Sequence, residues 1–278
     1  MKINLLYFLT FILVLTSCSN DNDSQNEIQN FDPNTILPKK ITQDIYSPGF
    51  GENSHNIVYE FFYDNSKLSI IEIYGTFVDN GNLIEDERYL YFTYNGNFIS
   101  KIELKNNLGE VLEYYDYTYL NNKLVERKIF RDNSLLTSYN YIYNSNTITR
   151  NYTFNDFNGN PVSVSDNYVL TDNLISRYNA DIWSGYDSTD IFYSSSISPF
   201  KNIIGLQDAL VEGGVDFLDS ELSSLFFSTK KNLLNNPFGE FLYTNNDIEF
   251  PISVHFFEGG IGSINYDNKT ITYHLYYQ

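Results

Sequence analysis

The chain has 278 residues, enough for one large domain or two modest ones after a signal segment. It carries 17 Lys and Arg against 35 Asp and Glu, a formal net charge of −18. Repulsion from phosphates therefore excludes a nucleic-acid partner, and anionic lipid headgroups repel the chain as well. Its single cysteine excludes an internal disulfide and a cysteine-based structural zinc site.

The first eighteen residues have the layout of a signal segment. Lys2 precedes an apolar run, residues 5–15, which is shorter than the about 20 residues of a membrane-spanning helix. Small residues then lead to Cys18, the only cysteine. This layout resembles the lipobox of bacterial lipoproteins, which implies cleavage before Cys18 and attachment of three acyl chains, palmitate among them, to this residue. A plain secretory signal or a short membrane anchor is the alternative.

Residues 18–45 are expected to form a lipidated, flexible and acidic tether, because they are rich in Asn, Asp, Gln and Pro and show no periodicity. The tract at 20–24 resembles the export tether of surface lipoproteins in Bacteroidota, and an ordinary solvated linker explains it equally well. Ser19 follows Cys18, which in the better-known sorting systems favours the outer membrane. We expect a lipid-anchored outer-membrane protein, on the cell surface or the periplasmic face.

From about residue 56 one sequence phrase recurs: an aromatic strand, a short turn rich in Asn and Asp, and a second strand. Its clearest copies place a tyrosine before the turn at Tyr63, Tyr94, Tyr119 and Tyr143, roughly 24 to 31 residues apart. Asn and Asp suit such turns because they tolerate positive φ. The phrase predicts one mainly β domain over 46–278, an antiparallel meander of repeated β-hairpins that forms a curved or open barrel-like sheet.

The phrases Tyr-Asp-Asn-Ser-Lys-Leu at 63–68 and Tyr-Asp-Asn-Lys-Thr-Ile at 266–271 resemble the YD hairpin repeats of RHS-type proteins. Together with the lipobox, they resemble more closely the Bacteroidota lipoproteins that carry such YD-like repeats and whose function is unknown. Only the turn at Asn95-Gly96 keeps the glycine of true YD repeats in the first position, and none ends in Gly-Arg, which argues against a long RHS-type shell. The resemblance implies an architecture and no activity.

Alternation within the strands predicts one aromatic face. Tyr117 and Tyr141 are each flanked two residues away by further tyrosines, so each stripe shares one face of the sheet. The segment at about 204–235 interrupts the meander, and its apolar spacing predicts two short helices near 204–230, which would cover the aromatic face. The second helix would present Phe217, Leu222 and Phe226 to it.

No catalytic motif, metal spacing or cofactor fingerprint is present in the sequence, so we expect no metal and no cofactor. His55, His255 and His274 are scattered, and the glycines at 259–262 lack the lysine and helix of a phosphate loop. One cluster fits a ligand site, because exposed aromatic rings beside carboxylates commonly hold sugar rings. Its members are Tyr178, Asp181, Trp183 and Tyr186. A core Trp183 beside a solvated loop is the alternative, since Trp is highly buried on average.

Three functions follow from these observations. The first is a non-catalytic binding module of the cell envelope for a glycan, a peptide or a partner protein. The second is a structural accessory subunit of an outer-membrane complex. The third, a hydrolase, is the least favoured, because no constellation of residues meets the first geometric requirements of an active site.

Overall fold

The computed structural model describes residues 32–46, 55–79, 82–155, 159–179, 188–211, 231–236, 239–258 and 270–278. All of these residues except Asp32 belong to one compact unit, Pro33–Gln278. Cys18 and the signal segment lie outside the described residues, so lipidation stays a prediction.

Sixteen strands form one antiparallel sheet in the order β12-β11-β10-β9-β8-β7-β6-β5-β4-β3-β2-β1-β18-β17-β16-β15. Strands that follow one another in the chain are neighbours from β1 to β12, which confirms the expected meander of hairpins. The strands are β1 (Pro38–Tyr46), β2 (His55–Asp64), β3 (Lys67–Asp79), β4 (Asn82–Asn95), β5 (Phe98–Asn106), β6 (Val111–Leu120), β7 (Lys123–Arg131), β8 (Ser134–Tyr143), β9 (Thr147–Asn155), β10 (Pro161–Thr171), β11 (Leu174–Asn179), β12 (Thr189–Asp190), β15 (Asn235–Asn236), β16 (Gly239–Asn245), β17 (Pro251–Glu258) and β18 (Thr270–Tyr277). A separate pair consists of β13 (Tyr193–Ile197) and β14 (Lys231–Leu233).

All of strand β1 except Tyr46 lies inside the segment expected to be a tether. It pairs with both β2 and β18, so it is an interior strand of the sheet. Its inward side chains, Ile41, Gln43 and Ile45, are buried, and Tyr59 donates a hydrogen bond to the Gln43 side chain at 2.6 Å. The domain therefore starts before residue 46. The aromatic phrase that marks the later hairpins is missing from β1, which is why the sequence pattern overlooked it.

The turns between strands confirm the role expected of Asn and Asp. Positive φ angles occur at Asn65, at the Asn121–Asn122 pair, at Asp132–Asn133 and at Asp172–Asn173. This conformation costs little free energy for a residue with a short polar side chain, so a two-residue turn can reverse the chain there.

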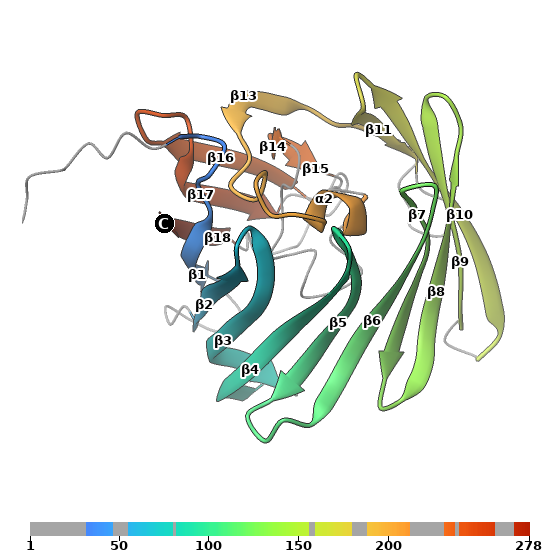
Figure 1. Cartoon of the computed structure of the whole chain (residues 1–278), viewed down its shortest axis with the longest axis horizontal. Coiled ribbons are helices and arrows are strands. Elements are labelled where there is room, and N and C mark those ends of the chain that lie inside the picture. The colour runs from blue at the N-terminus through green and yellow to red at the C-terminus, as the bar shows by residue number, and fades with distance from the viewer. Residues whose placement is uncertain are drawn as a thin grey trace, which may run out of the picture. The chain divides into compact units, whose positions relative to one another are not determined.

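The sheet is curved and α2 lies on its concave side (Figure 1). Buried side chains of the sheet and of α2 form one core cluster. Tyr117 and Tyr141 are both buried there, and the tyrosines before the turns pack against the same core. The only helix among the described residues is α2 (Leu206–Ala209), a single turn that contacts β5 and β7. It falls within the first of the two predicted helices, whereas Phe217, Leu222 and Phe226 lie outside the described residues. The described part of the chain contains no helix with the length and apolarity to cross a membrane.

Candidate binding site at the seam of the sheet

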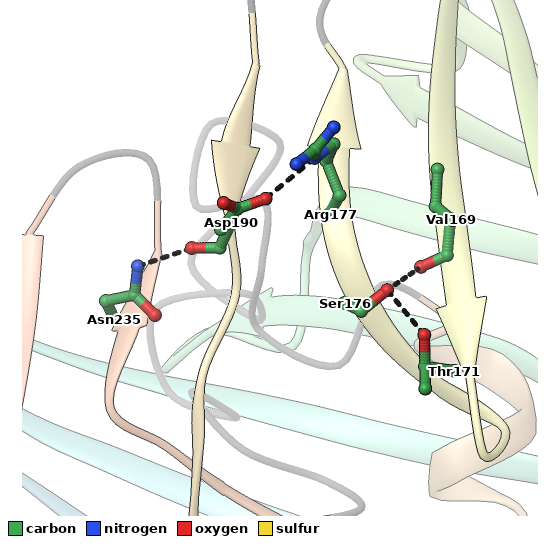
Figure 2. Close-up of polar contacts among 6 residues, drawn as sticks. All are labelled: Val169, Thr171, Ser176, Arg177, Asp190 and Asn235. Atoms are coloured by element: carbon green, nitrogen blue, oxygen red, sulfur yellow. Dashed lines mark hydrogen bonds and ion pairs between the residues drawn. The ribbon is translucent and has the colours of Figure 1, made fainter.

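The two edge strands of the sheet, β12 and β15, are joined by one side chain (Figure 2). Asn235 donates from Nδ2 to the Asp190 carbonyl oxygen at 2.7 Å, and its Oδ1 accepts the Phe192 backbone N–H at 2.8 Å. The Leu234 N–H also donates to the Phe192 carbonyl oxygen at 2.8 Å. We call these four residues the seam. It satisfies edge groups that would otherwise be open to another strand.

The seam is supported on both sides. On one side Arg177 of β11 forms an ion pair with Asp190, in which Arg177 Nε donates to Asp190 Oδ1 at 2.7 Å (Figure 2). This hydrogen bond is the main reason that the pKa of Arg177 is raised. On the other side the buried Asn232 side chain donates to Ser196 Oγ at 3.0 Å and to the Ile197 carbonyl oxygen at 2.9 Å. These contacts fix the backbone on either side of the seam.

Phe192 is held by its backbone while its ring is open to solvent. Its N–H and carbonyl oxygen are both bonded across the seam, yet the residue is 60% exposed. Ile191, next to it, is buried, as alternation in an extended segment requires. An exposed aromatic ring on a fixed backbone is a preorganised contact surface, because little conformational freedom remains to be lost on binding.

A hollow of about 630 Å³, called here the seam hollow, lies beside this ring. The turn between β10 and β11 supplies Asp172 and Asn173, α2 supplies Gln207, and β14 supplies Lys231. This volume falls in the range of small-ligand sites, roughly 300–1,000 Å³. The hollow thus combines an aromatic face with a carboxylate, two amides and an ammonium group.

The polar groups of the seam hollow can hydrogen-bond a neutral, polyhydroxylated ligand. A carboxylate accepts, an ammonium donates, and an amide does both. Among the described lining residues Asp172 is the only carboxylate, whereas glycoside hydrolysis ordinarily uses two facing carboxyl groups. What these residues can do is bind and orient a ligand.

The structure describes one residue of the cluster predicted from the sequence. Tyr178 lies on β11, buried, with its ring stacked on Tyr168 at a centroid distance of 5.2 Å. Asp181, Trp183 and Tyr186 lie outside the described residues, so ligand binding by the cluster stays a prediction.

Sequence reasoning did not find Phe192 or the polar residues around it. Phe192 stands between Ile191 and Tyr193, and three apolar residues in a row give no alternation that would mark the outward member. Asp172 and Asn173 have the composition of an ordinary turn. Gln207 and Lys231 approach the hollow from distant parts of the chain, and no local pattern reveals that.

His255 and His274 contact different neighbours and do not form a site with each other. His255 Nδ1 lies 3.0 Å from Thr272 Oγ1, and His274 Nε2 lies 3.5 Å from Asp44 Oδ2. Within the described ranges, no group of three His, Cys, Asp or Glu side chains is placed to hold a metal ion.

No protein-family model matches the sequence, and no curated protein matches it. Among solved structures, a porin-like protein from Bacteroides uniformis is similar with 11% identity and a TM-score of 0.43, covering 87% of this chain and 98% of that one. A porin-like protein from Bacteroides vulgatus has 10% identity and a TM-score of 0.24, covering 87% of this chain and 99% of that one. Both TM-scores lie below 0.5, so the likeness fixes neither a family nor a function for this chain.

Proposed function

We propose that this protein is a lipid-anchored protein of the cell envelope that binds a carbohydrate, without catalysis, in the seam hollow. The observation that carries the binding role is Phe192, a solvent-exposed ring on a backbone fixed across the seam, beside a hollow with several hydrogen-bonding side chains. The envelope address rests on the sequence around Cys18.

A sugar ring fits this arrangement for two reasons. Its C–H face is apolar and stacks on the face of an aromatic ring, which carries partial negative charge. Its hydroxyl groups both donate and accept, so they match the carboxylate of Asp172 and the amides of Asn173 and Gln207. A hollow with a few convergent polar groups and one aromatic surface is a common form of small-ligand site.

The test is a glycan array probed with the full chain in detergent, followed by titration calorimetry with the best glycan. Phe192→Ala should weaken binding about tenfold, a change that corresponds to about 1.4 kcal/mol. Phe62→Ala is the matched control, because Phe62 is also an exposed phenylalanine (43%) on a strand of the same sheet. It should bind like the wild type.

A second variant tests the positioning of the ring. Asn235→Ala removes both side-chain hydrogen bonds of the seam but does not touch the hollow's lining. It should weaken glycan binding less than Phe192→Ala does. Absence of any glycan signal, or an equal loss in Phe62→Ala and Phe192→Ala, would contradict the proposal and favour an accessory-subunit role.

A further inference from the structure

The seam hollow lies at one end of the sheet. Neighbouring strands of an antiparallel meander alternate in direction, so the turns that follow β2, β4, β6, β8 and β10 share one end. The last of these is the Asp172–Asn173 turn, which lines the hollow. The Ile204 N–H donates to the Ser66 carbonyl oxygen at 2.9 Å, so the loop before α2 packs on the first of them. We call this end of the sheet the α2 end.

The chain enters the domain at the same end. Strand β1 begins there, because the Tyr63 hydroxyl of β2 donates to the Pro38 carbonyl oxygen at 2.8 Å. We call residues 33–37, which precede β1, the entry segment. Its backbone is fixed by Gln278: the Leu37 N–H donates to the Gln278 carbonyl oxygen at 3.3 Å, and the Gln278 N–H donates back at 3.0 Å.

Asn202 joins the entry segment to the loop that leads to the hollow. Its Nδ2 donates to the Pro33 carbonyl oxygen at 2.9 Å and to the Ile36 carbonyl oxygen at 2.8 Å. Gln207, which lines the hollow, follows Asn202 by five residues. The Cα atoms of these two residues are therefore at most about 18 Å apart. The entry segment and the seam hollow are thus neighbours at the α2 end.

This placement limits the distance between the hollow and a lipid attached to Cys18. Fifteen residue steps separate Cys18 from Pro33, and they span at most about 54 Å even when fully extended. The opposite end of the sheet is one strand length further away; β8, with 10 residues, is about 30 Å long. An anchored domain therefore keeps the seam hollow nearer to the bilayer, on average, than any site at the opposite end.

We propose that the seam hollow binds the sugar headgroup of a neutral glycolipid in the same membrane that holds the lipid anchor. The inference rests on the proposed function, both for the anchor at Cys18 and for the sugar site. Two molecules held in one membrane meet at a high effective concentration, which raises the apparent affinity without any new contact. The net charge of −18 selects an uncharged headgroup, because anionic headgroups repel the chain.

Reconstitution tests whether the glycan belongs to the same membrane. The lipidated full chain is placed in phosphatidylcholine vesicles, and the probe is a dialkylglycerol that carries the best glycan from the array. The probe is added either to the same vesicles or to separate ones. Hydrogen exchange of residues 171–176 and 191–193, which line the hollow, reports its occupancy. With the probe in the same vesicles exchange should slow about tenfold or more, and with the probe in separate vesicles it should not change.

An unanchored variant separates the effect of the membrane from sugar recognition. Soluble Cys18→Ala should bind the free glycan like the wild type, because the hollow is untouched. On vesicles that contain the probe it should need about tenfold more probe than the anchored wild type for half-saturation, because it loses the effective concentration. Ser17→Ala, which keeps the cysteine, is the matched control and should bind the probe like the wild type.

Two results would overturn the inference and leave the sugar site standing. The first is equal or stronger protection by the probe in separate vesicles, with clustering of the vesicles, which would show that the hollow faces away from the membrane. The second is equal binding of probe vesicles by Cys18→Ala and the wild type. Loss of free-glycan binding by the detergent-solubilised wild type is a different outcome, because it contradicts the proposed function itself and the inference with it.

Discussion

Arg150 and Asp166 lie directly opposite each other on β9 and β10 and form an ion pair of 2.5 Å with 2% and 1% side-chain exposure. The Arg150 guanidinium also lies over three tyrosine rings, at 5.1 to 5.6 Å from their centroids; they belong to Tyr139, Tyr152 and Tyr168. Aromatic faces attract a cation, and this attraction adds to the ion pair inside the core. The carboxylate and the three rings together compensate the buried positive charge.

Asp166→Asn should destabilise the protein by about 3–5 kcal/mol, because it removes the carboxylate charge that lies opposite a buried guanidinium. Chemical unfolding followed by tyrosine fluorescence measures this change. The control is Arg177→Gln, which breaks the Arg177–Asp190 ion pair of similar length, 2.7 Å. Because this pair is exposed to solvent, the variant should change the stability little.

A double variant completes this test. Arg150→Met with Asp166→Leu removes both buried charges, and it should recover a large part of the stability that Asp166→Asn loses. If Asp166→Asn unfolds at the same denaturant concentration as the wild type, the pair does not stabilise the fold.

The fold could be predicted from the sequence because the signals are local. The turn residues Asn95–Gly96 and Asp172–Asn173 mark hairpins within a few residues, and a meander joins strands that are neighbours in the chain. The Tyr117 and Tyr141 stripes likewise need only alternation. Nothing local indicates that Asp190 and Asn235 meet, or that Arg150 faces Asp166, because those contacts depend on how the strands align.

Tyr141→Ala should lower the free energy of unfolding by about 3–5 kcal/mol and the melting temperature markedly, because it removes a large side chain from the core. Tyr141 is 4% exposed, whereas Ile142, next to it on the same strand, is 53% exposed. Ile142→Ala is the matched control and should melt close to the wild type. Tyr117→Ala should behave like Tyr141→Ala. Equal melting of Tyr141→Ala and Ile142→Ala would place the tyrosine stripe outside the core.

Alkaline pH should destabilise the protein through its buried phenols. Burial raises the pKa of Tyr94 to about 12, and it raises the pKa of Tyr63 and Tyr277 further. In the unfolded chain the pKa is about 10, so stability is intact below pH 10 and falls between pH 10 and 12, where only the unfolded chain releases these protons. Urea unfolding at pH 9, 10 and 11 measures this decline, and Tyr94→Phe should show a shallower one. A free energy of unfolding that stays level up to pH 11 would contradict the prediction.

Cys18→Ala should abolish lipid attachment, because the thiol is the acceptor in the lipobox that the first eighteen residues resemble. A chain with two or more acyl groups is stably anchored, and one without acyl groups is not. In cells labelled with palmitate, the wild type should carry the label and partition into the detergent phase. The variant should be unlabelled and recovered as soluble or unprocessed protein. Ser17→Ala, which keeps a small residue before the cysteine, is the control and should remain lipidated. Palmitate labelling of the Cys18→Ala variant would show that the segment is an ordinary signal and that another residue carries the anchor.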